Sequence, residues 1–212
     1  AASLDVPSSV EIDYGGENED VQKTFTEMFL ALIAGMAGML AILVLEFNSF
    51  RYAFYLLFTI PLSLIGVLGG LTLTGQTLSF SSMLGLIALA GVIINHAIIL
   101  LDSILRKLEQ DKSVVGASLS DVIVISSAIR LRPIFLTTVT TVVGMLPLAF
   151  ASALWGPLAF AIMFGLSFAM VLTLVLIPVF FYRYPGEEYA HMKNEIPVVK
   201  ESFKSKLIKY VR

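Results

Sequence analysis

The chain has 212 residues, of which 57% are hydrophobic and only 14% are charged, and its formal net charge is −2. Soluble domains usually carry about 25% charged residues, so this composition excludes an ordinary soluble domain. The sequence has no cysteine, which excludes a disulfide framework and a thiolate metal site.

Two long stretches of the chain are free of charged residues. No acid, lysine or arginine lies between Arg51 and Asp102, and none lies between Arg132 and Arg183. Each stretch is about 50 residues long, whereas one membrane-spanning helix needs about 20 apolar residues. Each stretch therefore has room for at least two spans, and the sequence predicts an all-α membrane protein with a bundle of five transmembrane helices.

In chain order, a polar and acidic segment, residues 1–25, comes first, and its VEIDY favours a short strand. Residues 102–132 are expected to be a connector in which LSDVIVISSAIR lies along the membrane. The polar tail, residues 185–212, ends in VKESFKSKLIKYVR, which fits an interfacial helix and a solvated tail equally well. We expect the five spans at residues 26–45, 53–73, 80–101, 133–150 and 158–182.

The distribution of cations predicts the orientation of the chain. Five spans place the loops at 46–52 and 102–132 on the same side as the tail. That side has 13 of the 14 Lys and Arg residues, and the other side has only Lys23. Because cytoplasmic loops are rich in lysine and arginine, we expect the N-terminus in the periplasm and the C-terminus in the cytoplasm. Residue 1 is not methionine, so we expect its start to be a processed or cut end.

Small residues at helical spacing favour close packing between the spans. Lipid supplies no hydrophobic force between helices, so their backbones approach where side chains are small. The sequence offers such positions in three of the expected spans, and together they predict a compact bundle. The residues are Ala31 with Gly35, Ala34 with Gly38, Gly66 with Gly70, and the set Gly85, Ala88 and Gly91.

The third expected span contains LAGVIINHAIILLD, in which Asn95 and His96 are adjacent. Polar groups inside a membrane usually face a protein interior or a water path. Asp102 follows Asn95 by seven residues and so shares its helical face. His96 can gain a charge near neutral pH. It is either a proton-linked switch or a neutral imidazole bonded to a carbonyl or a threonine.

The fourth expected span begins with RLRPIFLTTVTTVVG. Thr137 and Thr141 lie on one stripe of this helix, and Thr138 lies beside them. Each hydroxyl can bond the carbonyl one turn back in its own helix. The clustering of these threonines opposite Asn95 and His96 favours an interhelical hydrogen-bond network.

Motifs for catalysis do not stand out. The sequence has no HExxH, GxSxG, phosphate loop or carboxylate pair, so we expect neither an enzyme nor a cofactor or metal site. The cations lie at the expected membrane edges, so we expect the lipid bilayer as a partner and no nucleic acid.

Five stretches, in this order, resemble the resistance-nodulation-division (RND) transporters, hydrophobe/amphiphile efflux branch. The resemblance covers residues 10–184 and matches the end of the second half of such a transporter. It implies that residues 1–25 end a periplasmic porter domain and that the spans are the last five of twelve helices. The stretches are YGGENED, LEFNSFRYAFYLLFTIPLSLIGVLGGLTLTGQTLSF, GLIALAGVIINHAIILLD, RLRPIFLTTVTTVVGMLPLAF and WGPLAFAIMFGLSFAMVLTLVLIPVFF.

The resemblance implies a proton-driven antiporter of the bacterial inner membrane that expels drugs or other amphiphiles. Members work as homotrimers, often with a periplasmic adaptor and an outer-membrane channel. Their protons are carried by an acid pair on the fourth helix of the first half, which this sequence does not contain. The chain would therefore contribute the second half of the proton-relay bundle, require the first half of the same transporter and be inactive alone.

The third expected span resembles the helix that, in many members, sets a lysine against those acids. Here Asn95 occupies that place, as asparagine does in other members of the branch, and His96 follows it. Arg130 and Thr137 match family positions at the cytoplasmic mouth of the proton path and within it. The candidate proton-relay residues are Asn95, His96, Asp102, Arg130, Thr137, Thr138 and Thr141.

Two other functions are open at this point. The chain is alternatively a stand-alone small membrane protein that acts as an assembly or regulatory partner of a complete transporter. The second alternative is a membrane sensor similar to the sterol-sensing families. Neither alternative changes the predicted fold.

Overall fold

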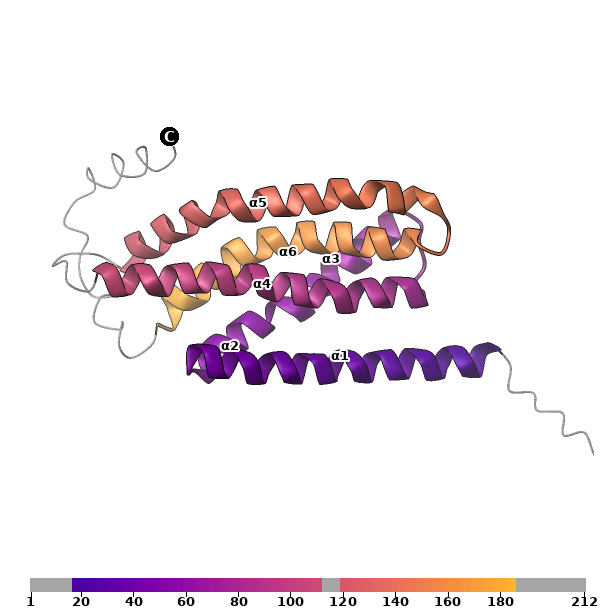
Figure 1. Cartoon of the computed structure of the whole chain (residues 1–212), viewed down its shortest axis with the longest axis horizontal. Coiled ribbons are helices and arrows are strands. Elements are labelled where there is room, and N and C mark those ends of the chain that lie inside the picture. Colours follow the sequence, from indigo (N-terminus) through magenta and orange to yellow (C-terminus); the bar gives the residue numbers. More distant parts are fainter. Residues whose placement is uncertain (1–16, 112–118, 186–212) are drawn as a thin grey trace, which may run out of the picture.

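The computed structural model describes residues 17–111 and 119–185, and within these ranges the regular structure is entirely helical (Figure 1). The all-α prediction is therefore confirmed. The predicted strand at VEIDY and the predicted interfacial helix of the tail lie outside the described residues. The helices are α1 (Glu17–Phe47), α2 (Phe50–Leu57), α3 (Thr59–Leu73), α4 (Phe80–Asp111), α5 (Leu119–Ala151) and α6 (Gly156–Arg183).

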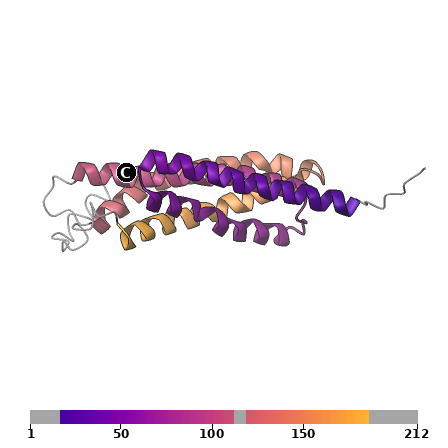
Figure 2. The same cartoon turned by 90° about the horizontal axis from the view of Figure 1, so that it is seen from below.

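The helices form five passes that run alternately up and down an elongated bundle. With α2 and α3 taken as one pass, five segments are long and apolar enough to cross a membrane. Figures 1 and 2 show the passes side by side, with α1 beginning at one end of the bundle and α6 ending at the other. The chain is thus a multi-pass membrane protein, as its two charge-free stretches predict.

The second pass is interrupted at Phe58, between α2 and α3. Pro61 has no N–H group, so the carbonyl four residues earlier loses its usual helical partner. The carbonyl that loses its partner is that of Leu57. At the same place the buried Thr59 hydroxyl donates to the carbonyl of the neighbouring residue, Leu56, at 2.6 Å. The proline therefore breaks the helix without breaking the span.

The expected connector over 102–132 is mostly helical. α4 and α5 extend toward each other until only residues 112–118 lie between them in the chain. LSDVIVISSAIR is therefore the continuous start of α5 rather than a separate segment along the membrane, and Pro133 lies inside α5. An ion pair one turn apart, Asp102 with Arg106 at 2.8 Å, supports the extension of α4.

The turn between α3 and α4 reverses the chain within a few residues. Gly75 has a φ of +68°, a backbone conformation that favours glycine. The N–H of Gln76 donates to the Leu71 carbonyl at 2.9 Å, which ends α3 in a Schellman-type arrangement. The N–H of Ser79 then donates to the Ser82 hydroxyl at 2.8 Å, which caps the start of α4. These bonds bring α3 and α4 together as antiparallel neighbours.

α6 is the central helix of the bundle, since it contacts α3, α4 and α5 extensively. Two glycines of α3 allow its approach. A Cβ added at Gly66 would overlap Phe168, and one added at Gly70 would overlap Phe164. The predicted close packing at Gly66 and Gly70 is therefore confirmed.

The other predicted small-residue positions divide between contact and open space. A Cβ added at Gly85 would lie 2.9 Å from the Leu158 carbonyl oxygen, so α4 and α6 also approach closely. At Gly35, Gly38 and Gly91 an added Cβ would meet nothing within 4 Å. For these three glycines the prediction of close packing is wrong within the described bundle, because they lie on outward faces of α1 and α4.

The passes differ in how much of their apolar surface is buried. In the most apolar stretch of α4, 56% of the residues are buried inside the bundle. In the corresponding stretches of α1 and α5 only 17% are buried. α1 and α5 therefore lie at the edges of the bundle. The wide exposed surface of α5 is available to lipid or to further helices.

Candidate functional site

The buried imidazole of His96 lies between two spans. His96 is on α4 and is only 7% exposed. Its Nε2 lies 3.3 Å from the hydroxyl oxygen of Thr137 on α5. The two helices are therefore joined by a polar contact inside a mainly apolar bundle.

The surroundings of the Thr137 hydroxyl indicate how its proton is used. Its oxygen lies 3.1 Å from the Pro133 carbonyl and 2.9 Å from the Ile134 carbonyl. A hydroxyl that donates its one proton to a carbonyl can only accept from the imidazole. The Nε2 of His96 then carries a proton, as it does in one neutral tautomer and in the charged imidazolium. Thr137 thus links the ring to the backbone of α5 and orients it.

The other candidate threonines, Thr138 and Thr141, make no hydrogen bond to α4 in the described part of the chain. Thr141 donates to the Thr137 carbonyl at 2.8 Å and so bonds within its own helix. Thr138 is 3% exposed, and in the described part of the chain its hydroxyl has no hydrogen-bond partner. The interhelical hydrogen-bond network therefore has fewer members than the clustering of threonines predicts. For Thr141 the reason is that a backbone carbonyl one turn back takes its hydroxyl.

Asn95 and His96 face different surroundings. Successive residues of a helix point about 100° apart, so the turn that buries His96 against α5 directs Asn95 outward. Asn95 is exposed, together with Ala88, Gly91 and Val92 on the same side of α4. We call these four residues the α4 stripe. An amide on an outward surface of a membrane span is the most unusual feature of this face.

Asp102 and Arg130 are not bonded to the His96–Thr137 pair in the described residues. Both carboxyl oxygens of Asp102 accept from the Nε of Arg106 at 2.8 Å. The Nε of Arg130 is buried and has no hydrogen-bond partner among the described residues. Of the seven candidates, His96 and Thr137 are therefore the pair whose side chains the described structure joins across two helices.

Sequence reasoning missed two polar residues of the bundle, Arg106 and Thr173. Arg106 pairs with Asp102, and their spacing of four residues is the signal that identifies such a pair. Thr173 is 1% exposed on α6, the central helix. Its only sequence signal is a lone hydroxyl in an apolar run.

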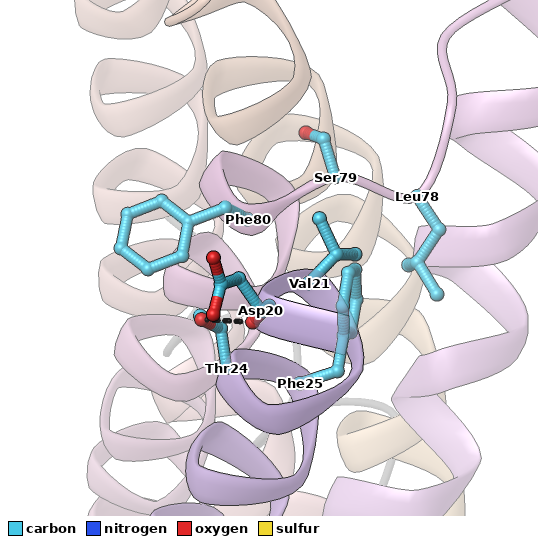
Figure 3. Close-up of a pocket in the computed structure, with 7 residues that line it drawn as sticks. All are labelled: Asp20, Val21, Thr24, Phe25, Leu78, Ser79 and Phe80. Carbon is cyan, nitrogen blue, oxygen red and sulfur yellow. Dashed lines mark hydrogen bonds between the residues drawn. The ribbon is translucent and has the colours of Figure 1, made fainter. Parts of the chain in front are cut away.

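A cavity of about 800 Å³ lies at the opposite end of the bundle from Arg106. Figure 3 shows it between the first turns of α1 and the segment that leads into α4. Most of its side chains are apolar, and Asp20 is the one charged residue among them. Its lining residues are Asp20, Val21, Thr24, Phe25, Leu78, Ser79 and Phe80.

Replacing Thr137 by Val removes the hydroxyl at nearly constant volume, and we expect it to destabilise the bundle by about 0.6 kcal/mol, the mean for an interhelical hydrogen bond in a membrane protein. Thr140→Val is the matched control, because Thr140 bonds only the Leu136 and Thr137 carbonyls of its own helix. Equilibrium unfolding in mixed micelles measures both. Equal losses in the two variants would contradict the contact with His96.

These features define a multi-pass helical membrane protein with a titratable side chain held between two of its spans. The chain belongs to the AcrB/AcrD/AcrF family, whose model matches residues 1–184. The predicted resemblance to the transmembrane portion of an RND transporter is therefore confirmed, and the family is one of transporters.

Individual relatives agree with this assignment. The chain is 32% identical to the swarming motility protein SwrC of Bacillus subtilis, over 83% of this chain and 17% of SwrC. It is 30% identical to the multidrug resistance protein MdtC of Erwinia tasmaniensis, over 84% of this chain and 17% of MdtC. A crystal structure of a heavy metal efflux pump superposes with a TM-score of 0.67 at 31% identity, covering 79% of this chain and 16% of the pump. The chain thus spans only about a sixth of these relatives.

Proposed function

We propose that the chain is the C-terminal transmembrane part of a proton-driven RND transporter that exports drugs or other amphiphiles across the bacterial inner membrane. In this proposal its N-terminal side faces the periplasm, and the first half of the same transporter completes the bundle. Family membership and the match to a sixth of longer relatives support it. The same membership supports, as part of the proposal, a homotrimeric assembly with a periplasmic adaptor and an outer-membrane channel.

The α4 stripe is the observation that carries the proposal. Asn95 is exposed there, one turn after Gly91, and a Cβ added at Gly91 would meet nothing within 4 Å. Small residues permit a close helix neighbour, whereas an amide that faces acyl chains leaves its polar groups unsatisfied. We therefore assign the stripe to a contact with the helix of the first half that carries the acid pair.

In the proposed chemistry Asn95 and His96 have different roles: Asn95 hydrogen-bonds to the acid pair, and His96 is the titratable group. The Asn95 amide donates to a carboxylate of the acid pair and accepts from the protonated carboxyl, so it can follow the acid through both states. Unlike a lysine at this place, the amide contributes no positive charge. His96 supplies the titratable group, and its contact with Thr137 holds the ring as the acids load and release protons.

The cavity at the start of α1 supports the amphiphile part of the proposal. Its volume, about 800 Å³, is within the range of small-molecule sites, roughly 300–1,000 Å³. Apolar walls with a single carboxylate suit an amphiphile with a cationic group. In the proposed orientation this cavity lies at the periplasmic end of the bundle.

The direct test is to coexpress the chain with the first half of an RND transporter and reconstitute both in proteoliposomes. We expect export of an amphiphilic dye that depends on a pH gradient and stops when an uncoupler collapses it. The chain alone should export nothing. Copurification of the two halves without gradient-driven export would contradict the proposal, and so would stable binding to an intact transporter in place of a half.

A further inference from the structure

An aromatic groove opens between α2 and α6, at the end of the bundle where α2 begins and α6 ends. It has a volume of about 130 Å³ and is lined by Phe54, Tyr55, Phe58, Phe180 and Tyr184. Tyr55 stacks on Phe180 with ring centroids 5.5 Å apart, and Phe58 meets Phe180 edge to face at 6.0 Å. These ring contacts make a well-packed apolar wall along the groove.

The groove opens toward the outside of the bundle rather than into its core. Phe54 is 64% exposed, Phe58 is 40% exposed and Tyr184 is 53% exposed. In a membrane-spanning bundle such rings face lipid, and tyrosine side chains such as Tyr55 and Tyr184 favour the depth of the lipid headgroups. The groove therefore offers apolar surface at the membrane–water boundary.

Arginines stand at one end of the aromatic groove on both helices. Arg51 precedes Phe54 and Tyr55 by three and four residues, so the three share one face of α2. Arg183 follows Phe180 by three residues and shares its face of α6 in the same way. Because α2 and α6 run in opposite directions (Figure 1), both arginines lie at the same end of the groove.

Both arginines are associated with rings of the groove. The guanidinium of Arg183 lies over the Tyr184 ring, 5.2 Å from its centroid. Arg51 is exposed and lies close enough to Tyr55 for an electrostatic interaction. A pair of guanidinium groups beside an apolar channel is complementary to a molecule with a negative head and an apolar chain.

We propose that the aromatic groove binds an anionic phospholipid from the leaflet at this end of the bundle. Arg51 and Arg183 bind its phosphate, which matches the planar fork of the guanidinium. One acyl chain lies over Phe54, Phe58 and Phe180. This inference goes beyond the proposed transport function and does not rest on it.

Native mass spectrometry tests the lipid site on the intact membrane protein that contains this chain, in micelles with equal amounts of phosphatidylglycerol and phosphatidylcholine. We expect at least a fivefold preference for retained phosphatidylglycerol. The double variant Arg51→Gln/Arg183→Gln should lose the preference, and Arg51→Lys/Arg183→Lys should keep most of it. Arg106→Gln, which removes a cation from the same end of the bundle, is the matched control and should behave as the unmodified protein.

Four results would overturn the lipid site. They are equal retention of both lipids by the unmodified protein, an unchanged preference in the double glutamine variant, complete competition by free glycerol phosphate, and increased lipid retention after removal of residues 186–212. The third would indicate a bare anion site, and the fourth would show that the tail fills the groove. Should the double variant fail to fold, each single variant, Arg51→Gln and Arg183→Gln, is expected to lose at least half of the preference.

Discussion

Replacing Asn95 by Leu in the full transporter should reduce proton-coupled efflux by a factor of ten or more. A hydrogen bond to a charged group contributes about 1.5–3 kcal/mol, and about 1.4 kcal/mol corresponds to a factor of ten. The amount of protein in the membrane should not change, because Asn95 is exposed on the α4 stripe and is not part of the buried core. Dye export from cells and an immunoblot of the membranes measure the two quantities.

Val92→Leu is the matched control for this prediction. Val92 lies one turn before Asn95 on the same stripe and is 36% exposed, so the control changes apolar volume at the proposed interface without removing an amide. Efflux should stay within a factor of two or so of the unmodified transporter. Normal efflux in Asn95→Leu would reject the assignment of the α4 stripe to the proton-relay helix.

Replacing Gly70 by Val should destabilise the bundle by about 2–3 kcal/mol, toward the upper end for overpacking. The Cβ of the new side chain would overlap the Cβ and ring of Phe164. A Cβ is fixed to the backbone, so it cannot rotate away as the tip of a flexible side chain does. The contact between α3 and the central helix α6 would have to separate. The effect is measured by thermal unfolding in detergent. The fraction of protein that stays soluble and monodisperse is recorded at each temperature.

Gly69→Val is an unusually close control, because it makes the same change one residue earlier in the same helix. A Cβ at Gly69 would meet nothing within 4 Å, so any cost from the branched side chain itself appears in both variants. The difference between them isolates the clash with α6. Equal stability of Gly69→Val and Gly70→Val would mean that α3 and α6 do not pack as described.

The spans were predictable because their physical cause is compositional. A continuously apolar, charge-free stretch of about 50 residues favours membrane-spanning helices whatever its partners, because a helix satisfies its backbone hydrogen bonds within its own segment. The contacts at Gly66 and Gly70 were also predictable, since their spacing places two small residues on one face. The helical character of residues 102–111 and 119–132 was harder to predict. Polarity ends a membrane span but not a helix, and the Asp102–Arg106 pair allows α4 to continue beyond the apolar stretch.

The candidate site was predictable in its residue types but not in its partners. A lone imidazole in an apolar span indicates a polar environment, yet the sequence does not reveal which neighbour supplies it. Adjacent residues of a helix can face different elements, and here only His96 turns toward α5. The competition between backbone carbonyls and the imidazole for threonine hydroxyls is likewise decided by helix rotation. Only the packed structure shows that the hydroxyl of Thr137 contacts the His96 imidazole, whereas the hydroxyl of Thr141 bonds a carbonyl of its own helix.

The central position of α6 has a consequence for biogenesis. Of the six described helices α6 is synthesised last, yet α3, α4 and α5 all pack on it. During translation the earlier helices therefore enter the bilayer before their main neighbour has left the ribosome. Until then the glycine faces of α3 and α4 that later contact α6, at Gly66, Gly70 and Gly85, are covered only by lipid or by insertion factors. The bundle thus assembles by a late insertion that closes it, rather than by growth from its first helix.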